Sequence, residues 1–307
     1  MHETSFTITT AAPFRFDLTT WVLRRRTKNA IDQWDGHTYR RALMLDGISL
    51  LFTAKQSNSL RPLLTVKLYS QQQLSPNQRN SIKRLARRVF GLDADLQPFY
   101  ILAASEPVLG ELTERFRGVR PTRYPTLFEA LVNAITCQQI SLDAGISVLN
   151  RLSEKYGSKF VGNDGALYHA FPQPEDLINV PETDLKQLGF SYQKTRSIKE
   201  LALAVANGNI ELEKLETASN EEAKAYLQAI RGIGRWSAEY VLLRGLGRLD
   251  VFPGDDIGGQ NNVQKLLQLD TRPDYEELGR LTTKWYPYAG LIYFYLLLNK
   301  LHRKGLA

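Results

Sequence analysis

The stretch Leu227-Gln-Ala-Ile-Arg-Gly-Ile-Gly-Arg-Trp-Ser-Ala-Glu-Tyr240 decides the fold of the second half of this chain. Apolar residues recur at three- and four-residue spacing on both sides of the two glycines, which predicts two helices joined by a tight hairpin. Glycine allows backbone angles that are closed to other residues. The free N–H groups of Gly232, Ile233 and Gly234 lie at the positive end of the second helix, and Arg235 adds a full charge. The pattern predicts a binding site for a phosphate group.

Length and composition indicate an ordinary globular protein of about two domains. The chain has 307 residues, of which 43% are hydrophobic and 23% are charged. Its net charge of +7 suits a polyanionic partner such as nucleic acid without requiring one. The single cysteine, Cys137, excludes an internal disulfide, a four-cysteine zinc site and a four-cysteine iron–sulfur cluster within the chain.

Neither a secretory signal nor a membrane span is expected. The N-terminal residues lack a basic segment followed by an apolar one. The longest apolar run, Leu291 to Leu298, is far shorter than the roughly 20 residues that a membrane span needs. We therefore expect a soluble protein in a reducing cytoplasm, associated with the nucleoid if the source is bacterial.

The first hundred residues predict a small α+β unit. Asp46-Gly47 between two apolar strands is a strong hairpin signal, and residues 64–69 alternate Leu64, Val66 and Leu68 with Thr65, Lys67 and Tyr69. Short helices are predicted for residues 18–26 and 76–90. His37 has no partner acid or cysteine at a recognisable spacing, so nothing in the unit predicts catalysis.

From about residue 97 onward the pattern predicts one helix after another. Residues 102–116 read as a single helix, and residues 157–170 read as a loop. Ser141 is a candidate N-cap, which places Gln138 and Gln139 at a corner between two helices. Two amides at such a corner are as often simply solvated as functional.

Carboxylates are the chemical candidates that remain. The sequence lacks the phosphate-binding loop, the dinucleotide-binding glycines and the zinc-deaminase pattern. Asp255 and Asp256 end the segment Asp250-Val-Phe-Pro-Gly-Asp-Asp256, and one of them is expected to cap a helix beginning at Ile257. If Asp255 caps that helix, Asp256 is free to point elsewhere. An ionised, fixed acid beside a phosphate-binding hairpin suits chemistry at a sugar carbon, where positive charge develops.

The hairpin, the Asp250–Asp256 segment, residues 127–141 and residues 188–194 together closely resemble the helix-hairpin-helix (HhH-GPD) DNA glycosylases, specifically the AlkA-like 3-methyladenine DNA glycosylases II. The resemblance covers about residues 100–300. It implies an α+β chain in which a small domain with an antiparallel sheet, residues 1–100, precedes an all-α glycosylase region, residues 101–307. Within that region one helical subdomain spans 125–248, and the second combines 101–124 with 249–307.

The resemblance also implies roles for individual residues. Asp256 matches the catalytic aspartate and Asp255 its structural neighbour, while Trp236 stands where the lyase branch has a lysine, which implies a monofunctional enzyme. Trp236 and Tyr240 match aromatic positions that line the base pocket, although either could equally be an ordinary core aromatic. Gln139 falls where the family inserts a side chain into the gap left by the flipped base.

The implied activity is hydrolysis of the N-glycosidic bond of alkylated bases, of the 3-methyladenine and 7-methylguanine type, during base excision repair. The partner is double-stranded DNA with a damaged base, bound by a monomer away from any membrane. No cofactor or catalytic metal is expected, although hairpin carbonyls could hold a monovalent cation. The alternatives are a relative specific for oxidised or deaminated bases and a non-catalytic DNA-binding module. Two departures from the family pattern are Ala289, where an arginine is usual, and the glycine pair Gly258-Gly259.

Overall fold

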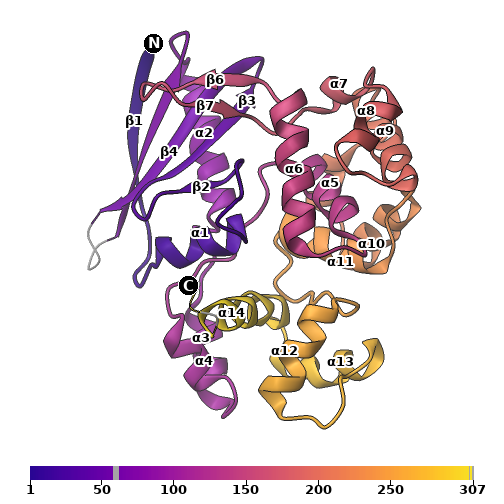
Figure 1. Cartoon of the computed structure of the whole chain (residues 1–307). Coiled ribbons are helices and arrows are strands. Elements are labelled where there is room, and N and C mark those ends of the chain that lie inside the picture. Colours follow the sequence, from indigo (N-terminus) through magenta and orange to yellow (C-terminus); the bar gives the residue numbers. More distant parts are fainter. Residues whose placement is uncertain (58–61, 304, 306–307) are drawn as a thin grey trace.

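The computed structural model describes residues 1–57, 62–303 and 305, and Figure 1 shows a sheet beside two groups of helices. The main sheet is antiparallel, with strand order β1-β5-β4-β3-β2. Its strands are β1 (His2–Thr9), β2 (Gln33–Trp34), β3 (Tyr39–Leu45), β4 (Ile48–Ser57) and β5 (Leu63–Ser70). This sheet, followed by a helical region, confirms the predicted α+β class.

The predicted hairpin joins β3 to β4. Leu45 pairs with Ile48, and the two residues between them, Asp46 and Gly47, have φ angles of 49° and 75°. Positive φ at both central residues is what a type I′ hairpin turn requires, and the twist of such a turn matches that of the flanking strands. On β5, Val66 is completely buried, as its place in the alternating pattern predicts.

Two helices accompany the sheet, α1 (Phe16–Arg24) and α2 (Pro76–Val89). Helix α2 begins with a capping box, in which Ser75 accepts from the Gln78 N–H and the Gln78 side chain accepts from the Ser75 N–H. Its buried residues are Ile82, Ala86 and Val89. Both helices lie within two residues of their predicted bounds, because amphipathic spacing and caps are local signals.

The remaining helices form the larger part of the molecule. They are α3 (Gln97–Ser105), α4 (Gly110–Arg115), α5 (Leu127–Cys137), α6 (Leu142–Tyr156), α7 (Pro174–Leu177), α8 (Glu182–Gln187), α9 (Tyr192–Ala206), α10 (Asn220–Ala229), α11 (Arg235–Val241), α12 (Ile257–Leu267), α13 (Tyr275–Thr282) and α14 (Ala289–His302). Short 3₁₀ or π turns are η1 (Leu212–Glu216), η2 (Leu242–Leu246) and η3 (Thr283–Trp285).

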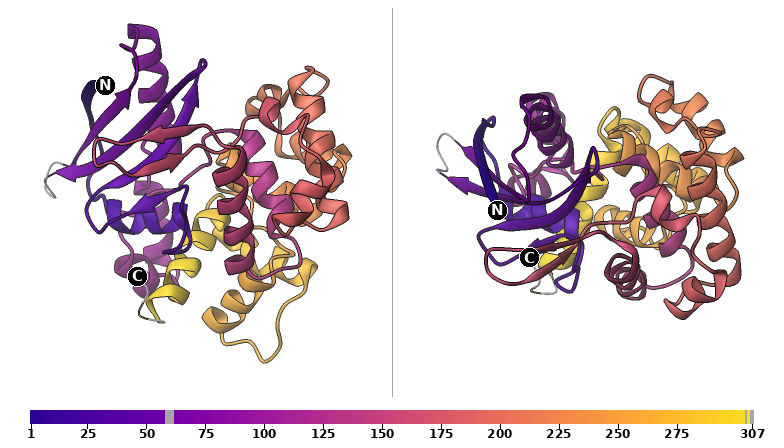
Figure 2. Two further views of the ribbon diagram at one scale, coloured as in Figure 1. Left: turned by 45° about the horizontal axis from the view of Figure 1, so that its top comes forward. Right: turned by 90° about the horizontal axis from the view of Figure 1, so that it is seen from above.

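Two predicted elements differ from the structure. The single helix predicted for residues 102–116 is two helices, because Pro107 has no N–H to donate and disfavours helical backbone at Glu106. The predicted loop at 157–170 contains a short hairpin, β6 (Lys159–Val161) and β7 (Leu167–His169). This hairpin extends from the helical region along the N-terminal sheet, where its residues share a small core with β3 and β4 (Figure 2).

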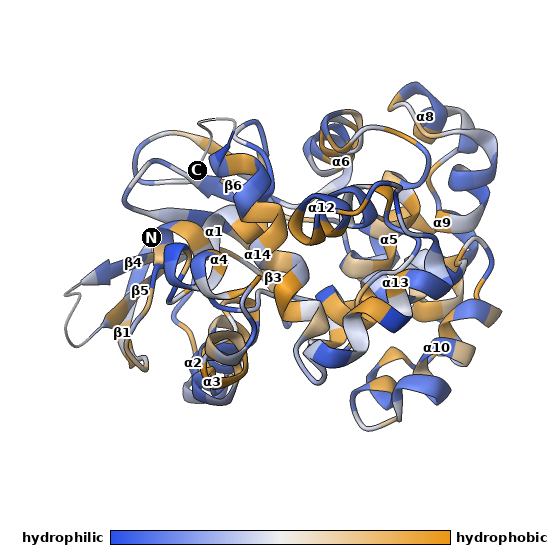
Figure 3. Ribbon diagram, turned by 90° about the horizontal axis from the view of Figure 1, so that it is seen from below, coloured by the Kyte–Doolittle hydropathy of each residue, from blue (hydrophilic) through white to orange (hydrophobic). Residues whose placement is uncertain are grey.

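The helices form two hydrophobic clusters. One combines α5, α6, α9, α10 and α11, and the other combines α3, α4, α12, α13 and α14 with Leu18 and Val22 of α1. Helix α14, largely apolar in Figure 3, is the centre of the second cluster. No helix among the described residues is long and apolar enough to cross a membrane. The division of the chain into residues 1–100 and 101–307 stays a prediction.

A buried ion cluster ties the N-terminal sheet to α5. Arg41 of β3, 2% exposed, donates to Asp32 over 2.6 Å and to Glu129 of α5 over 2.5 Å. A buried charge needs such partners, since an unpaired one is strongly destabilising. The sheet is therefore fixed rigidly against the helix that leads to the Gln138-Gln139 corner.

Candidate active site

The predicted helix-hairpin-helix is formed by α10 and α11. Helix α10 ends at Ala229, and Gly232 in the turn has a φ of 81°, a left-handed conformation that favours glycine. A side chain at Gly232 would also collide with Ser197 of α9, whose Oγ would lie 2.4 Å from the added Cβ. Gly234 has an ordinary φ of −88°, and a Cβ there would meet no atom within 4 Å. Gly232 shapes the turn, whereas Gly234 keeps its surface open.

The hairpin offers fewer free N–H groups than its sequence predicts. The N–H of Ile233 donates to the Ile230 carbonyl over 3.1 Å, so the expectation that it is free is wrong. The N–H groups at the beginning of α11 have no partner within the helix, since each lacks a preceding turn. An anion at this hairpin is therefore expected to bind Gly234 and the first turn of α11.

The Gln138-Gln139 corner is attached to the hairpin. The Gln138 amide donates to the Gly232 carbonyl over 2.7 Å and to Ser237 Oγ over 2.8 Å. Lys194 donates to the carbonyls of Thr136 and Gln138, and this fastens the end of α5. Gln139 is exposed with a φ of 54°, and the next residue, Ile140, is 40% exposed. Both side chains thus stand at an exposed tip beside the hairpin.

Arg235 is engaged within the protein. Its guanidinium makes two hydrogen bonds to Asp255, at 2.6 and 2.9 Å, and lies 3.6 Å from the centre of the Tyr275 ring. Both members of the ion pair are partly exposed, so water weakens the pair. Arg235 carries charge near the hairpin and also fixes Asp255, which lies at the end of the loop that leads to α12.

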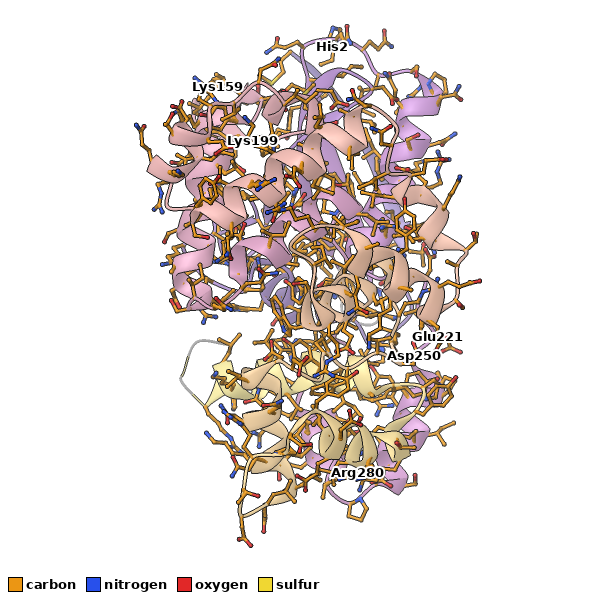
Figure 4. The ribbon with its side chains drawn as sticks, turned by 90° about the vertical axis from the view of Figure 1, so that its right-hand side faces the viewer. His2, Lys159, Lys199, Glu221, Asp250 and Arg280 are labelled. Atoms are coloured by element: carbon orange, nitrogen blue, oxygen red, sulfur yellow. The ribbon has the colours of Figure 1, made fainter. Side chains whose placement is uncertain are left out.

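The segment that precedes Asp256 crosses between the two groups of helices. Figure 4 shows Asp250 where the upper helices give way to the lower ones, near Glu221. Asn220 donates to Asp250 over 2.7 Å. Farther along, the buried carboxylate of Glu239 accepts from the Gly254 N–H at 2.9 Å, and the Gln260 side chain donates to the Gly254 carbonyl at 2.9 Å. The peptide groups just before the two acids are therefore held from both sides.

Asp256 caps α12 and is held by three donors. Its Oδ1 accepts from the Gly259 N–H at 2.6 Å, so the alternative in which Asp255 is the cap is wrong. Its Oδ2 accepts from Trp236 Nε1 at 3.2 Å and from the Tyr293 hydroxyl at 3.1 Å. One carboxylate oxygen thus serves the helix, while the other lies between two aromatic side chains.

The glycine pair at the start of α12 has a steric explanation. A Cβ at Gly258 would lie 2.9 Å from Asp256 Oδ1, and a Cβ at Gly259 would lie 3.0 Å from Phe252 and 3.2 Å from Tyr293. Both glycines make room around the capping carboxylate and its aromatic neighbours. Ala289, where an arginine was expected, is buried at the start of α14.

Trp236 and Tyr240 stack on each other beside Asp256. Their ring centres are 5.3 Å apart with an interplanar angle of 27°. Trp236 is partly buried, whereas Tyr240 is only 5% exposed. The Tyr240 hydroxyl lies in the core, so only its ring is available to the site. The structure thus brings together Asp256, Trp236 and Tyr240, and it places the hairpin and Gln139 alongside.

Sequence reasoning missed three residues at this site. They are Tyr293, which donates to Asp256, Glu239, which holds the Gly254 N–H, and Arg25, whose guanidinium donates to the Tyr240 hydroxyl at 3.0 Å. Burial and the charge of Asp256 raise the pKa of Tyr293 well above its usual value, so its hydroxyl remains a donor. No local signal distinguishes these residues, since their partners lie far away in sequence.

Comparison with known proteins decides the family. The profile of the HhH-GPD superfamily of base excision DNA repair proteins matches residues 132–288, and that of the AlkA N-terminal domain matches residues 5–124. The chain belongs to the HhH-GPD superfamily. The DNA-3-methyladenine glycosylase of Bacillus subtilis is 28% identical over 297 residues, 96% of this chain and 97% of that protein. DNA-3-methyladenine glycosylase 2 of Escherichia coli is 32% identical over 148 residues, 48% of this chain and 51% of that protein.

Solved structures agree with this assignment. The 3-methyladenine DNA glycosylase of Archaeoglobus fulgidus superposes with a TM-score of 0.85 at 25% identity, covering 97% of this chain and 98% of that one. A Schizosaccharomyces pombe 3-methyladenine DNA glycosylase, solved in complex with abasic DNA, superposes with a TM-score of 0.57 at 28% identity over 66% of this chain and 95% of that one. The predicted family and enzyme class, a helix-hairpin-helix DNA glycosylase, are confirmed. In this HhH-GPD protein, the side chains of Asp256, Trp236 and Tyr240 lie in one contiguous site.

Proposed function

We propose that this HhH-GPD protein is a monofunctional glycosylase that hydrolyses the N-glycosidic bond of alkylated bases, of the 3-methyladenine and 7-methylguanine type, in double-stranded DNA. The observation that carries the proposal is the position of Asp256. Its Oδ2 is fixed by Trp236 and Tyr293 next to a stacked aromatic pair. The names of the Bacillus subtilis and Escherichia coli relatives support the choice of alkylated bases.

The reaction follows from this geometry. The hairpin, with Gly232, Ile233, Gly234 and Arg235, binds the DNA backbone. The damaged nucleotide then rotates out of the duplex. This rotation costs a few kcal/mol, and the cost is lowest for a damaged base. A base that carries positive charge stacks on the Trp236 and Tyr240 pair through a cation–π attraction. Such a base is already a good leaving group and needs no general acid. Asp256 then stabilises the developing positive charge on the sugar or activates the attacking water.

Gln139 is proposed to occupy the space in the duplex that the rotated nucleotide leaves. Its exposure at the corner beside the hairpin supports this role, and so does the hydrogen bond from Gln138 that fixes the corner to the Gly232 carbonyl. A side chain inserted there would offset part of the lost base stacking.

The test is mass spectrometry of the bases released from methylated DNA by the wild type and by Asp256→Asn. Asparagine is as good an N-cap as aspartate, so the variant keeps the hydrogen bond from Gly259 and the start of α12. We expect it to bind DNA normally and to release no 3-methyladenine. The matched control is Asp255→Asn, which loses the pair with Arg235 but keeps release. Unchanged release by Asp256→Asn contradicts the assignment.

The absence of lyase activity is tested separately. Trp236 occupies the position of the lyase lysine, and Lys224, one helix away, is paired with Glu239 and Tyr275. Without an amine at the sugar carbon, borohydride should trap no covalent adduct between the protein and DNA containing an excised site. A trapped adduct would show that an amine, and not water, attacks the sugar.

A further inference from the structure

Arg25 is a buried cation that the N-terminal unit contributes to the base pocket. It follows α1, has a φ of 62° and is 5% exposed. Its guanidinium donates to the Tyr240 hydroxyl at 3.0 Å and to Asn133 Oδ1 at 2.6 Å. The bond to Tyr240 spans 215 positions of the sequence. A residue of the sheet-bearing unit therefore contacts the aromatic pair on which the flipped base is proposed to stack.

These contacts close into a ring with one possible proton arrangement. An arginine only donates, so the Tyr240 oxygen accepts from Arg25. Tyr124 donates to Asn133 Oδ1 at 3.1 Å, which leaves the Tyr240 proton for the Tyr124 oxygen at 2.8 Å. Burial raises the pKa of Tyr124 well above its usual value, so its proton stays in place. The ring fixes Tyr240 with its hydroxyl proton turned into the core.

Among the described residues, Arg25 forms no salt bridge with a carboxylate. Within residues 1–57, 62–303 and 305, the acceptors of its hydrogen bonds are the neutral side chains of Tyr240, Asn133 and Cys137, and its Nε is buried without an acceptor. The nearby buried acids, Asp32 and Glu129, are hydrogen-bonded to Arg41, and Arg25 interacts with Glu129 only through space, where its charge acts to lower the pKa of Glu129. An arrangement optimised for stability alone would pair such a charge, because an isolated buried charge is costly.

A second buried arginine adds to this positive charge. Arg244 of η2 is 1% exposed and donates to the carbonyl of Val22 at 3.0 Å. Its guanidinium lies 6.0 Å from the centre of the Tyr240 ring. Like Arg25, it has a buried Nε that finds no acceptor in the described part of the chain. Two cations thus lie behind Tyr240. Arg25 directly follows α1, and Arg244 donates to a carbonyl of α1.

Opposite charges therefore lie at the two ends of the stacked pair. Trp236 contacts Asp256 through its indole N–H, and Tyr240 contacts Arg25 through its hydroxyl, while the two rings stack at 5.3 Å. A base on this pair, with its sugar at Asp256, has an anion on the sugar side and a cation on the far side. Fixed charges of this kind act on a reaction without reorganising.

We propose that Arg25 is a positioning residue for catalysis, whose buried charge favours departure of the base. This rests on the proposed function. When the bond between C1′ and the base nitrogen breaks, its electron pair leaves with the base, so the charge of the base falls by one unit and the sugar gains one. Water then bonds to C1′ and gives its proton to Asp256 or solvent. A cation behind the base favours this change whether the base begins cationic or neutral.

Three variants separate charge from structure. Arg25→Met removes the charge and the hydrogen bonds. Arg25→Lys keeps the charge but cannot bind Tyr240 and Asn133 as a fork does. Asn133→Asp keeps the acceptor for Arg25 and places a neutralising carboxylate at 2.6 Å, while it loses the amide donor to the Glu129 carbonyl. Single-turnover release of 7-methylguanine, a cationic base, and of hypoxanthine, a neutral one, is measured for each, with melting temperatures to verify folding.

The expected order is set by charge. Roughly 10 Å from the base at an effective dielectric of about 20, a unit charge is worth on the order of tenfold in rate. Arg25→Met and Asn133→Asp should each lose about tenfold on both bases, whereas Arg25→Lys should lose less than about threefold. For the cationic base, kcat should fall without a rise in KM, since the lost charge repelled that base before cleavage.

A purely structural role gives the opposite order. Arg25→Lys would then be slower than Asn133→Asp, and that result, or equal rates for the two, overturns the proposal. The comparison of these two variants remains decisive if Arg25→Met does not fold. A wild type that releases neither 3-methyladenine nor 7-methylguanine contradicts the proposed function itself. A wild type that releases them while the variants show the structural order contradicts only the role of Arg25.

Discussion

The indole N–H of Trp236 donates to Asp256 Oδ2 over 3.2 Å, although twenty positions separate the two residues. Trp236 lies in the hairpin helix α11, and Asp256 is the residue immediately before α12. Trp236, which we propose stands in place of the lysine of the lyase branch, therefore also orients the Asp256 carboxylate. It links the hairpin helix α11 to the carboxylate that we propose acts on the sugar.

Tyr293→Phe should lower the single-turnover rate of base release by about tenfold, since it removes one of the two donors that orient Asp256 Oδ2. The control is Tyr295→Phe on the same helix, which removes another buried phenol hydroxyl away from Asp256. The measurement is release from methylated DNA together with thermal melting. Equal rates for the two variants would show that the Tyr293 hydroxyl does not orient the carboxylate.

Glu239→Gln should destabilise the protein by roughly 3 kcal/mol, because a buried carboxylate is removed from the Lys224 ammonium at 2.6 Å. It should also slow base release, since the amide cannot serve Lys224, Tyr275 and the Gly254 N–H together. Thermal melting and single-turnover release report the two effects. In Glu239→Gln with Lys224→Met, stability should partly recover, and a lack of recovery would indicate that Lys224 is not the source of the loss.

Gly232→Ala should lower the stability of the protein, whereas Gly234→Ala should lower its affinity for DNA. The first places a methyl group against Ser197 and forces a left-handed alanine, so we expect a loss of about 2 kcal/mol or more in unfolding free energy. The second meets no atom within 4 Å and should fold normally, but its methyl group stands where a DNA phosphate is expected to approach. Melting curves and DNA titrations separate them. Normal DNA affinity in Gly234→Ala would place the phosphate elsewhere.

Gln139→Ala and Ile140→Ala identify the side chain that enters the duplex. Both residues are exposed at the corner that Gln138 fastens to the hairpin and Lys194 fastens to α9. We expect Gln139→Ala to weaken binding to a duplex with an abasic-site analogue by about tenfold, since the gap is left empty. Ile140→Ala should have a smaller effect. If the larger loss falls on Ile140→Ala, the inserted residue is the apolar one.

The N-terminal unit should lose stability in acid partly through Asp35. Partial burial opposes its ionisation, but Arg40 and the N–H groups of Thr38 and His37 outweigh this and lower the pKa of Asp35 to about 2. A depressed pKa stabilises the folded state above about pH 4 and loses that effect as the pH falls towards 2. Because the side chain is 44% exposed, we expect only about 1 kcal/mol. Asp35→Asn should flatten this part of the curve of unfolding free energy against pH, and an unchanged curve would contradict the assignment.

Local patterns predicted much of the fold. The Asp46-Gly47 hairpin, the amphipathic α2 and the Ser141 cap are all confirmed, because their signals lie within a few residues. The break between α3 and α4 was missed despite Pro107, and the β6–β7 hairpin was missed because its short strands are stabilised by packing on a distant sheet.

By itself, the sequence determined the helix-hairpin-helix, the acidic pair after it and the family, since these depend on residue type and spacing along one segment. Tertiary structure decided which acid caps α12, which donors hold Asp256, and that Arg25 lies behind Tyr240. The physical reason is that buried polar groups take whichever partners the packed helices bring to them. Those partners come from elements up to 222 positions away, where no periodicity relates them.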